Sequence, residues 1–136
     1  MVDLSGVTVL GIDHVQLAAP RAREDDARGF YGGLLGMAEL RKPAALRARG
    51  GCWFAAGAQQ LHVGVAEPFA PARTAHPGLL VSDLDALRAR LAAAGVPFAD
   101  DGALDGVDRL FVEDPFGNRL ELRAAPPRVA EETRMA

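Results

Sequence analysis

The sequence has a single cysteine, one tryptophan and one tyrosine among its 136 residues. One cysteine, Cys52, excludes a disulfide within the chain, and this residue is best interpreted as a small apolar side chain of the interior. No apolar run approaches the roughly 20 residues needed to cross a bilayer. The amino terminus also lacks the cationic start and the long apolar stretch of a signal peptide. These absences predict a cytoplasmic protein.

The sequence also has no large excess of positive or negative side chains. Lys and Arg number 15 and Asp and Glu number 18, so the formal net charge is −3. Because the two signs are interspersed, the chain has no basic field for a phosphate backbone and no dense basic cluster for a membrane surface. A small-molecule partner is therefore expected, with neither nucleic acid nor membrane. The hydrophobic content of 49% suffices for one sizeable core and one domain.

Residues 7–66 have the pattern of a βαβββ module. A strand over residues 7–19 is followed by a helix from about Glu24, whose apolar stripe ends near Gly36. Three short strands then follow, separated by Pro and Gly residues, at residues 37–41, 51–55 and 60–65. In the middle strand Trp53 and Phe54 are adjacent, so they face opposite ways: one belongs to the core and the other can line a cavity.

The pattern restarts after a linker at residues 67–74, which contains Pro68 and Pro71. Residues 75–123 predict a second βαβββ module. Its first strand spans residues 75–81, and Ser82 is the expected N-cap of a helix with a buried leucine stripe. A poor strand at residues 97–100 and a hairpin over residues 108–123 complete it. Residues 124–136 are expected to be a flexible tail.

Three histidines and one glutamate occupy matching places in the two halves. His14 and His76 lie in the first strands, and His62 and Glu121 lie in the last strands, about 60 residues apart in both cases. Strand alternation places these four side chains opposite the apolar residues that the helices should cover. The uncovered faces are therefore predicted to form a ligand cavity.

Three imidazoles and one carboxylate suit a divalent ion such as Zn²⁺, Fe²⁺, Ni²⁺, Co²⁺ or Mn²⁺. Such a set leaves open positions for water or substrate, as a catalytic metal requires. The competing interpretation is that each histidine is simply a hydrogen-bonded strand residue. The symmetry of the set favours metal binding. Arg47, Arg49 and Arg73 are weaker candidates for binding an anionic substrate, since exposed arginines are common.

The chain from about residue 6 to residue 123 resembles the vicinal oxygen chelate superfamily, which includes glyoxalase I, methylmalonyl-CoA epimerase, extradiol dioxygenases, fosfomycin-resistance enzymes and bleomycin-resistance proteins. The segments that carry the resemblance are GIDHVQL at 11–17, FYGGLLGM at 30–37, QLHVG at 60–64, Ala75-His76 with VSDL at 81–84, and DPFGNRLE at 114–121.

The resemblance implies an α+β fold in which two βαβββ modules form a cup-shaped mixed sheet with helices outside. It implies one divalent metal held by His14, His62, His76 and Glu121, with Glu121 also a catalytic candidate that moves a proton. His62 stands where glyoxalase I and the epimerase usually carry Glu or Gln, and the dioxygenases use only two histidines and a glutamate, so a three-ligand site stays open.

Two functions remain as alternatives at this point. The first is a metal-dependent lyase, isomerase or dioxygenase that acts on a small molecule with neighbouring oxygens. The second is a metal-free protein of the bleomycin-resistance type that sequesters a drug or metabolite in the same cup. A homodimer is expected, with each site either inside one chain or shared between two.

Overall fold

The computed structural model describes residues 5–126. From residue 127 on, the expected flexible tail lies outside the described residues. Within them, two four-stranded mixed sheets confirm the predicted α+β fold of two βαβββ modules, whose sheets form open, cup-like halves. None of the described helices is long and apolar enough to span a membrane.

The first module has its strands in the order β1-β4-β3-β2. Strand β1 pairs in parallel with β4, and the other neighbours are antiparallel. A helical segment, α1 continued by η1, connects β1 to β2, and a short helix α2 that the sequence pattern did not predict precedes β3. The elements are β1 His14–Ala19, α1 Glu24–Ala27, η1 Arg28–Leu34, β2 Glu39–Leu40, α2 Ala44–Arg47, β3 Cys52–Ala56 and β4 Gln59–Val65.

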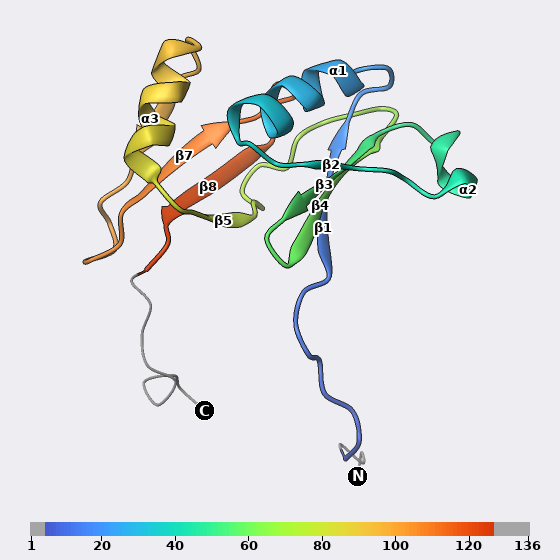
Figure 1. The fold of residues 1–136 in the computed structure, drawn as a ribbon, viewed down its shortest axis with the longest axis horizontal. Coiled ribbons are helices and arrows are strands. Elements are labelled where there is room, and N and C mark those ends of the chain that lie inside the picture. The colour runs from blue at the N-terminus through green and yellow to red at the C-terminus, as the bar shows by residue number, and fades with distance from the viewer. Residues whose placement is uncertain (1–4, 127–136) are drawn as a thin grey trace.

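The second module repeats this arrangement in the order β5-β8-β7-β6. Its first and last strands are again parallel neighbours at one end of the sheet. Figure 1 shows α1 and α3 on the same side of the molecule, above the two sheets. The elements are β5 Gly78–Val81, α3 Leu84–Ala93, β6 Phe98–Asp100, β7 Arg109–Glu113 and β8 Arg119–Ala124.

The helices cover the apolar faces of the sheets, as the periodicity predicts. The leucine stripe of α3, Leu84, Leu87 and Leu91, is buried. Phe54 is fully buried, so it is the core member of the Trp53–Phe54 pair. The first helix widens into a π-helical turn over Arg28–Leu34, a stretch that contains three glycines and therefore favours a regular α-helix less.

Three predicted boundaries are wrong. The first strand begins at His14 rather than residue 7, because among the described residues its pairing with β4 starts at His14 opposite Gln60, next to the Asp13 carbonyl that accepts the Gln60 N–H. Strand β5 begins at Gly78, so His76 precedes the strand; Pro77 between them has no backbone N–H to donate. The N-cap of α3 is Asp83, not Ser82, since the Asp83 carboxylate accepts the Ala86 N–H at 2.9 Å.

The loop between β7 and β8 joins the two modules. The buried Asp114 carboxylate accepts the Tyr31 hydroxyl at 2.6 Å and the backbone N–H groups of Phe116 and Asn118. The Asn118 side chain donates both to Asp114 and to the Ala18 carbonyl in β1. Burial, reinforced by the adjacent Asp114, raises the pKa of Tyr31, so its hydroxyl remains a donor. This network fixes the hairpin against the first module.

Candidate metal and ligand site

The first module carries a neutral, ring-lined surface on the side away from its helix, which we call the module-1 polar face: His14, Gln16, Trp53, Gln60 and His62. His62 lies between two rings, with its centroid 4.0 Å from that of Trp53 and 4.3 Å from that of His14. The interplanar angles are 3° and 17°, so the three rings form a stack across β3, β4 and β1.

His62 is held as a neutral imidazole. It is buried, and its Nε2 lies 2.8 Å from Gln60 Oε1, which accepts a hydrogen bond there. Burial, followed by the neighbouring His14, lowers the pKa of His62. A metal ligand must be unprotonated, and this environment favours that state. With Nε2 engaged by Gln60, however, the ring must use Nδ1 or leave Gln60 to bind an ion.

The second module carries a charged surface in the equivalent place, the module-2 polar face: His76, Gly78, Arg109, Phe111, Arg119, Glu121 and Arg123. The His76 ring is oriented by its Nδ1–H, which donates to the Thr74 carbonyl at 2.8 Å. This leaves Nε2 with a lone pair, 3.9 Å from Glu121 Oε1. Zinc ligands lie at about 2.0–2.2 Å from the ion, so one ion is able to bridge this gap.

Two arginines already pair with the Glu121 carboxylate. Arg109 Nη1 donates to Oε1 and Arg123 Nε donates to Oε2, each at 2.5 Å. Burial alone would raise the pKa of Glu121, but the hydrogen bonds from Arg123 and Arg109 outweigh it and hold the pKa below its usual range. Glu121 is therefore an ionised carboxylate whose two oxygens both have cationic partners.

The structure brings the four predicted ligands together as two pairs, not as one group. His14 with His62 forms the first pair and His76 with Glu121 the second. Among residues 5–126, no three or more His, Cys, Asp or Glu side chains lie close enough to hold a metal. Each pair fits a divalent ion in residue type, and the His76–Glu121 pair also fits in spacing. The nearly parallel rings of His14 and His62 must tilt toward each other to share an ion, because their lone pairs lie in the ring planes.

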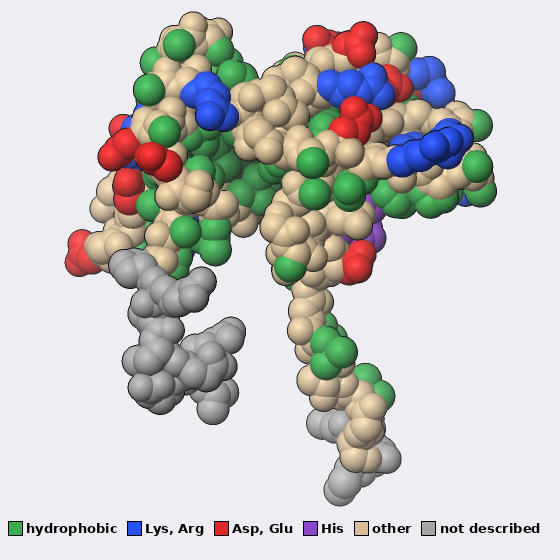
Figure 2. All heavy atoms as spheres, in the orientation of Figure 1, with side chains coloured by type: hydrophobic (Ala, Val, Ile, Leu, Met, Phe, Trp, Pro, Cys, Tyr) green, Lys and Arg blue, Asp and Glu red, His purple; other side chains and the backbone are tan. Residues whose placement is uncertain are grey.

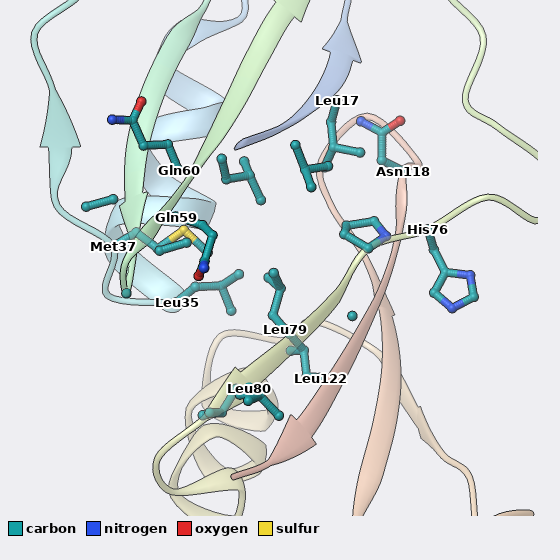
Figure 3. Close-up of a pocket in the computed structure, with 18 of the residues that line it drawn as sticks. Leu17, Leu35, Met37, Gln59, Gln60, His76, Leu79, Leu80, Asn118 and Leu122 are labelled. Carbon is teal, nitrogen blue, oxygen red and sulfur yellow. The ribbon is translucent and has the colours of Figure 1, made fainter. Parts of the chain in front are cut away.

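A groove of about 1640 Å³ lies between the modules, and it is mostly apolar. Figure 2 shows the hollow, with hydrophobic side chains at its base. In Figure 3 leucines from both modules line it, whereas the His76 ring points away from them. The groove is thus not where the four predicted ligands meet.

Sequence reasoning missed the arginines that matter most here. Arg109 alternates with Leu110 and Val112, so the period-2 pattern was sufficient to place it on the face of Glu121. The contact of Trp53 with His62 was predicted only in part. The sequence required one of Trp53 and Phe54 to lie outside the core, and in the structure that residue is Trp53. Arg47, one of the weaker candidates for binding an anionic substrate, donates to the Lys42 carbonyl.

Comparison with known proteins gives a consistent result. Residues 11–122 match the model of the Glyoxalase/Bleomycin resistance protein/Dioxygenase superfamily. A crystal structure of a putative glyoxalase family protein from Bacillus anthracis is 46% identical, with a TM-score of 0.85, and the match covers 88% of this chain and 98% of that one. The search of curated proteins found no match.

More distant structures share the fold. Lactoylglutathione lyase from Agrobacterium tumefaciens is 20% identical with a TM-score of 0.68, over 86% of this chain and 95% of that chain. The fosfomycin resistance protein FosX from Listeria monocytogenes is 14% identical with a TM-score of 0.69, over 88% and 97%.

Proposed function

Because the chain belongs to the Glyoxalase/Bleomycin resistance protein/Dioxygenase superfamily, we propose that it is a metal-dependent enzyme acting on a small molecule with two neighbouring oxygens, as a lyase, isomerase or dioxygenase. The observation that carries the proposal is the pairing of ligand-type side chains. His14 with His62, and His76 with Glu121, occupy equivalent positions on the uncovered faces of two equivalent modules.

His14, His62, His76 and Glu121 would hold one divalent ion of the Zn, Fe, Ni, Co or Mn type. When bound, that ion supplies a Lewis acid that polarises a substrate oxygen. The neutral state of His62 and the fixed orientation of His76 suit ligation. His62 is the member whose role is most in question, since Gln60 occupies its Nε2.

Glu121 is the candidate for moving a proton. In the state described, its low pKa makes it a weak base, because Arg109 and Arg123 stabilise the carboxylate. The proton-transfer role therefore requires at least one arginine to leave it. Arg123 is the freer of the two, with its side chain 35% exposed against 13% for Arg109.

A homodimer with shared sites is part of this proposal. The two pairs do not meet within the described chain, so a four-ligand site needs the polar face of one copy to meet that of a second. The chain also exposes large apolar side chains where such a copy can pack: Val7, Val9, Leu10, Ile12 and Leu80.

The direct test is elemental analysis of protein purified without a histidine tag. We expect about one metal ion per chain, and a loss of affinity of more than tenfold in His14→Ala, His76→Ala and Glu121→Gln, since removing a direct ligand should cost at least as much as removing its support. Gln16→Ala, on the same face as His14, is the matched control and should bind normally. Normal binding by His62→Ala would reduce the site to three ligands.

A metal-free binding protein is the second candidate. The observation that favours it is the engagement of both Glu121 oxygens by guanidinium groups, which leaves this carboxylate satisfied without an ion. Under this alternative, purified protein holds less than about a tenth of an equivalent of metal and gains none when metal is added.

A further inference from the structure

We propose that the groove between the modules is a second binding site, and that its ligand is an amphipathic carboxylate: a linear apolar chain with one anionic head group. The chain lies along the apolar walls of the groove, and the head group pairs with Arg90, which α3 contributes to the lining. This site is separate from the two polar faces, so it requires neither a metal nor the function proposed above.

The walls of the groove are apolar side chains that neither module buries completely. Leu35 and Met37 come from the first module and Leu79 comes from the second, and all three are half-buried and packed against the core. In Figure 3 these side chains lie around the same cavity. A contiguous apolar surface that stays partly exposed is typical of ligand grooves and interfaces. The groove therefore offers an apolar ligand contacts with both modules.

The size of the groove favours an extended ligand. Sites for compact small molecules have volumes of about 300–1,000 Å³, whereas this groove measures about 1640 Å³. One of its walls is a single face of α3, with lining residues at the spacing of successive helical turns: Asp83, Ala86, Leu87 and Arg90. A linear chain can follow such a wall, whereas a compact ligand would leave much of it uncovered.

The charged residues of the groove select the head group. The lining contains one carboxylate, Asp83, and one guanidinium, Arg90. Asp83 already caps α3 by accepting the Ala86 N–H at 2.9 Å. Arg90 Nη1 donates to the Leu34 carbonyl of the first module at 3.0 Å, and among residues 5–126 Arg90 has no carboxylate partner. That bond holds the guanidinium in place and leaves its other N–H donors for an anion, for which a carboxylate has the matching planar geometry.

The test is calorimetric titration of the full chain with decanoate, with a chelator present so that no metal contributes. We expect saturable binding. Octanoate, which is two carbons shorter, should bind about tenfold more weakly, because each buried CH₂ group changes an affinity about fourfold at most. Decyltrimethylammonium has a chain of the same length and a cationic head group, so it should bind at least about fivefold more weakly than decanoate.

Two pairs of variants locate the site. Arg90→Met should weaken decanoate binding about fivefold, whereas Arg49→Met, an exposed arginine outside the groove, should bind as the wild type does. Ala86→Phe places a ring in the groove and should weaken binding at least as much. Ala92→Phe, on the opposite side of α3, is its matched control. Both alanines are exposed, so the fold should tolerate either ring.

Equal affinities for decanoate and decyltrimethylammonium would overturn the role of Arg90, and unchanged binding by Ala86→Phe would show that the chain binds elsewhere. Absence of decanoate binding would reject the site altogether. If light scattering then found a dimer, a second copy of the chain would be the occupant of the groove instead. None of these results bears on the proposed metal function, which elemental analysis tests separately.

Discussion

Each module has a polar face on a four-stranded sheet of the same strand order, yet the module-1 polar face is neutral and the module-2 polar face is charged. On the module-1 polar face, His62 lies in a ring stack with Trp53 and His14. On the module-2 polar face, the equivalent position holds Glu121 between Arg109 and Arg123. Two copies of one architecture thus carry different halves of the candidate site.

The difference has a physical consequence for how each half responds to a cation. His62 is a neutral imidazole, and its ring and that of His14 only need to reorient. Glu121 is already engaged in two charge-assisted hydrogen bonds, which are among the stronger polar interactions in proteins and which a cation would have to weaken. Under the proposed function, the module-2 polar face should therefore limit the affinity for the ion, whereas the module-1 polar face would supply nitrogen ligands.

The largest effect on stability is expected from Glu121→Ala. Removing the carboxylate leaves the mostly buried Arg109 with only the more distant Asp101 carboxylate, at 3.3 Å, as a partner, and breaking a buried pair costs about 3 kcal/mol. Urea unfolding at neutral pH with a chelator present measures this change. Glu121→Gln retains hydrogen-bond acceptance and should lose less. Equal stability of the Ala variant and the wild type would show that the ion pairs contribute nothing.

A smaller loss is expected from Trp53→Leu on the module-1 polar face. The substitution retains an apolar side chain but removes the aromatic partner of His62, and ring pairs contribute about 1 kcal/mol beyond their buried area. The same urea titration applies, with Gln16→Ala as the surface control. A loss as large as that of Glu121→Ala would contradict the distinction between the two faces.

The smallest expected effect on stability concerns His62. It depends on pH, and its pH range distinguishes the module-1 polar face from the module-2 polar face. Its pKa in the folded protein is below the ordinary value of 6.5, so the folded state binds the proton less readily than the unfolded state does. The stability that neutral His62 contributes is therefore complete above pH 6.5, the ordinary pKa of histidine, and is lost as the pH falls toward the lower pKa of the folded state. His62→Phe keeps a ring in the stack and should flatten this part of the profile.

The pKa of Glu121 is also lowered, but from 4.5, so its contribution is lost in a more acidic window. Glu121→Gln should therefore change the profile only below about pH 4.5. If His62→Phe and Glu121→Gln altered the same pH range, the assignment of a neutral and a charged face would be wrong.

Much of the architecture could be predicted from periodicity alone. The two βαβββ modules, the buried α3 leucines and the common face of His14 and His62 all follow from local patterns. The pattern could not show that β5 begins after His76, because that depends on which residues find a pairing partner. Nor could it show that β1 begins only at His14.

The residue types of the candidate site can be proposed from the sequence, but the arrangement of their side chains cannot. Alternation identifies the face on which a side chain lies, and it says nothing of which neighbour it contacts. The stack of Trp53 on His62 and the contacts of Arg109 with Glu121 arise from strand register. Whether two pairs meet in one chain depends on how the modules pack, and here the Asp114 network at the β7–β8 loop helps to set that packing.

The central claim is that one metal site combines a pair from each polar face, drawn from two chains. Co-refolding His14→Ala with His76→Ala in equal amounts tests it, since both side chains are partly exposed and their loss should not disturb folding. In a randomly mixed dimer with shared sites, about a quarter of all sites regain every ligand. The account predicts that the mixture binds about a quarter of the wild-type amount of Co²⁺ with wild-type affinity. A mixture that binds no more than either variant alone would contradict it.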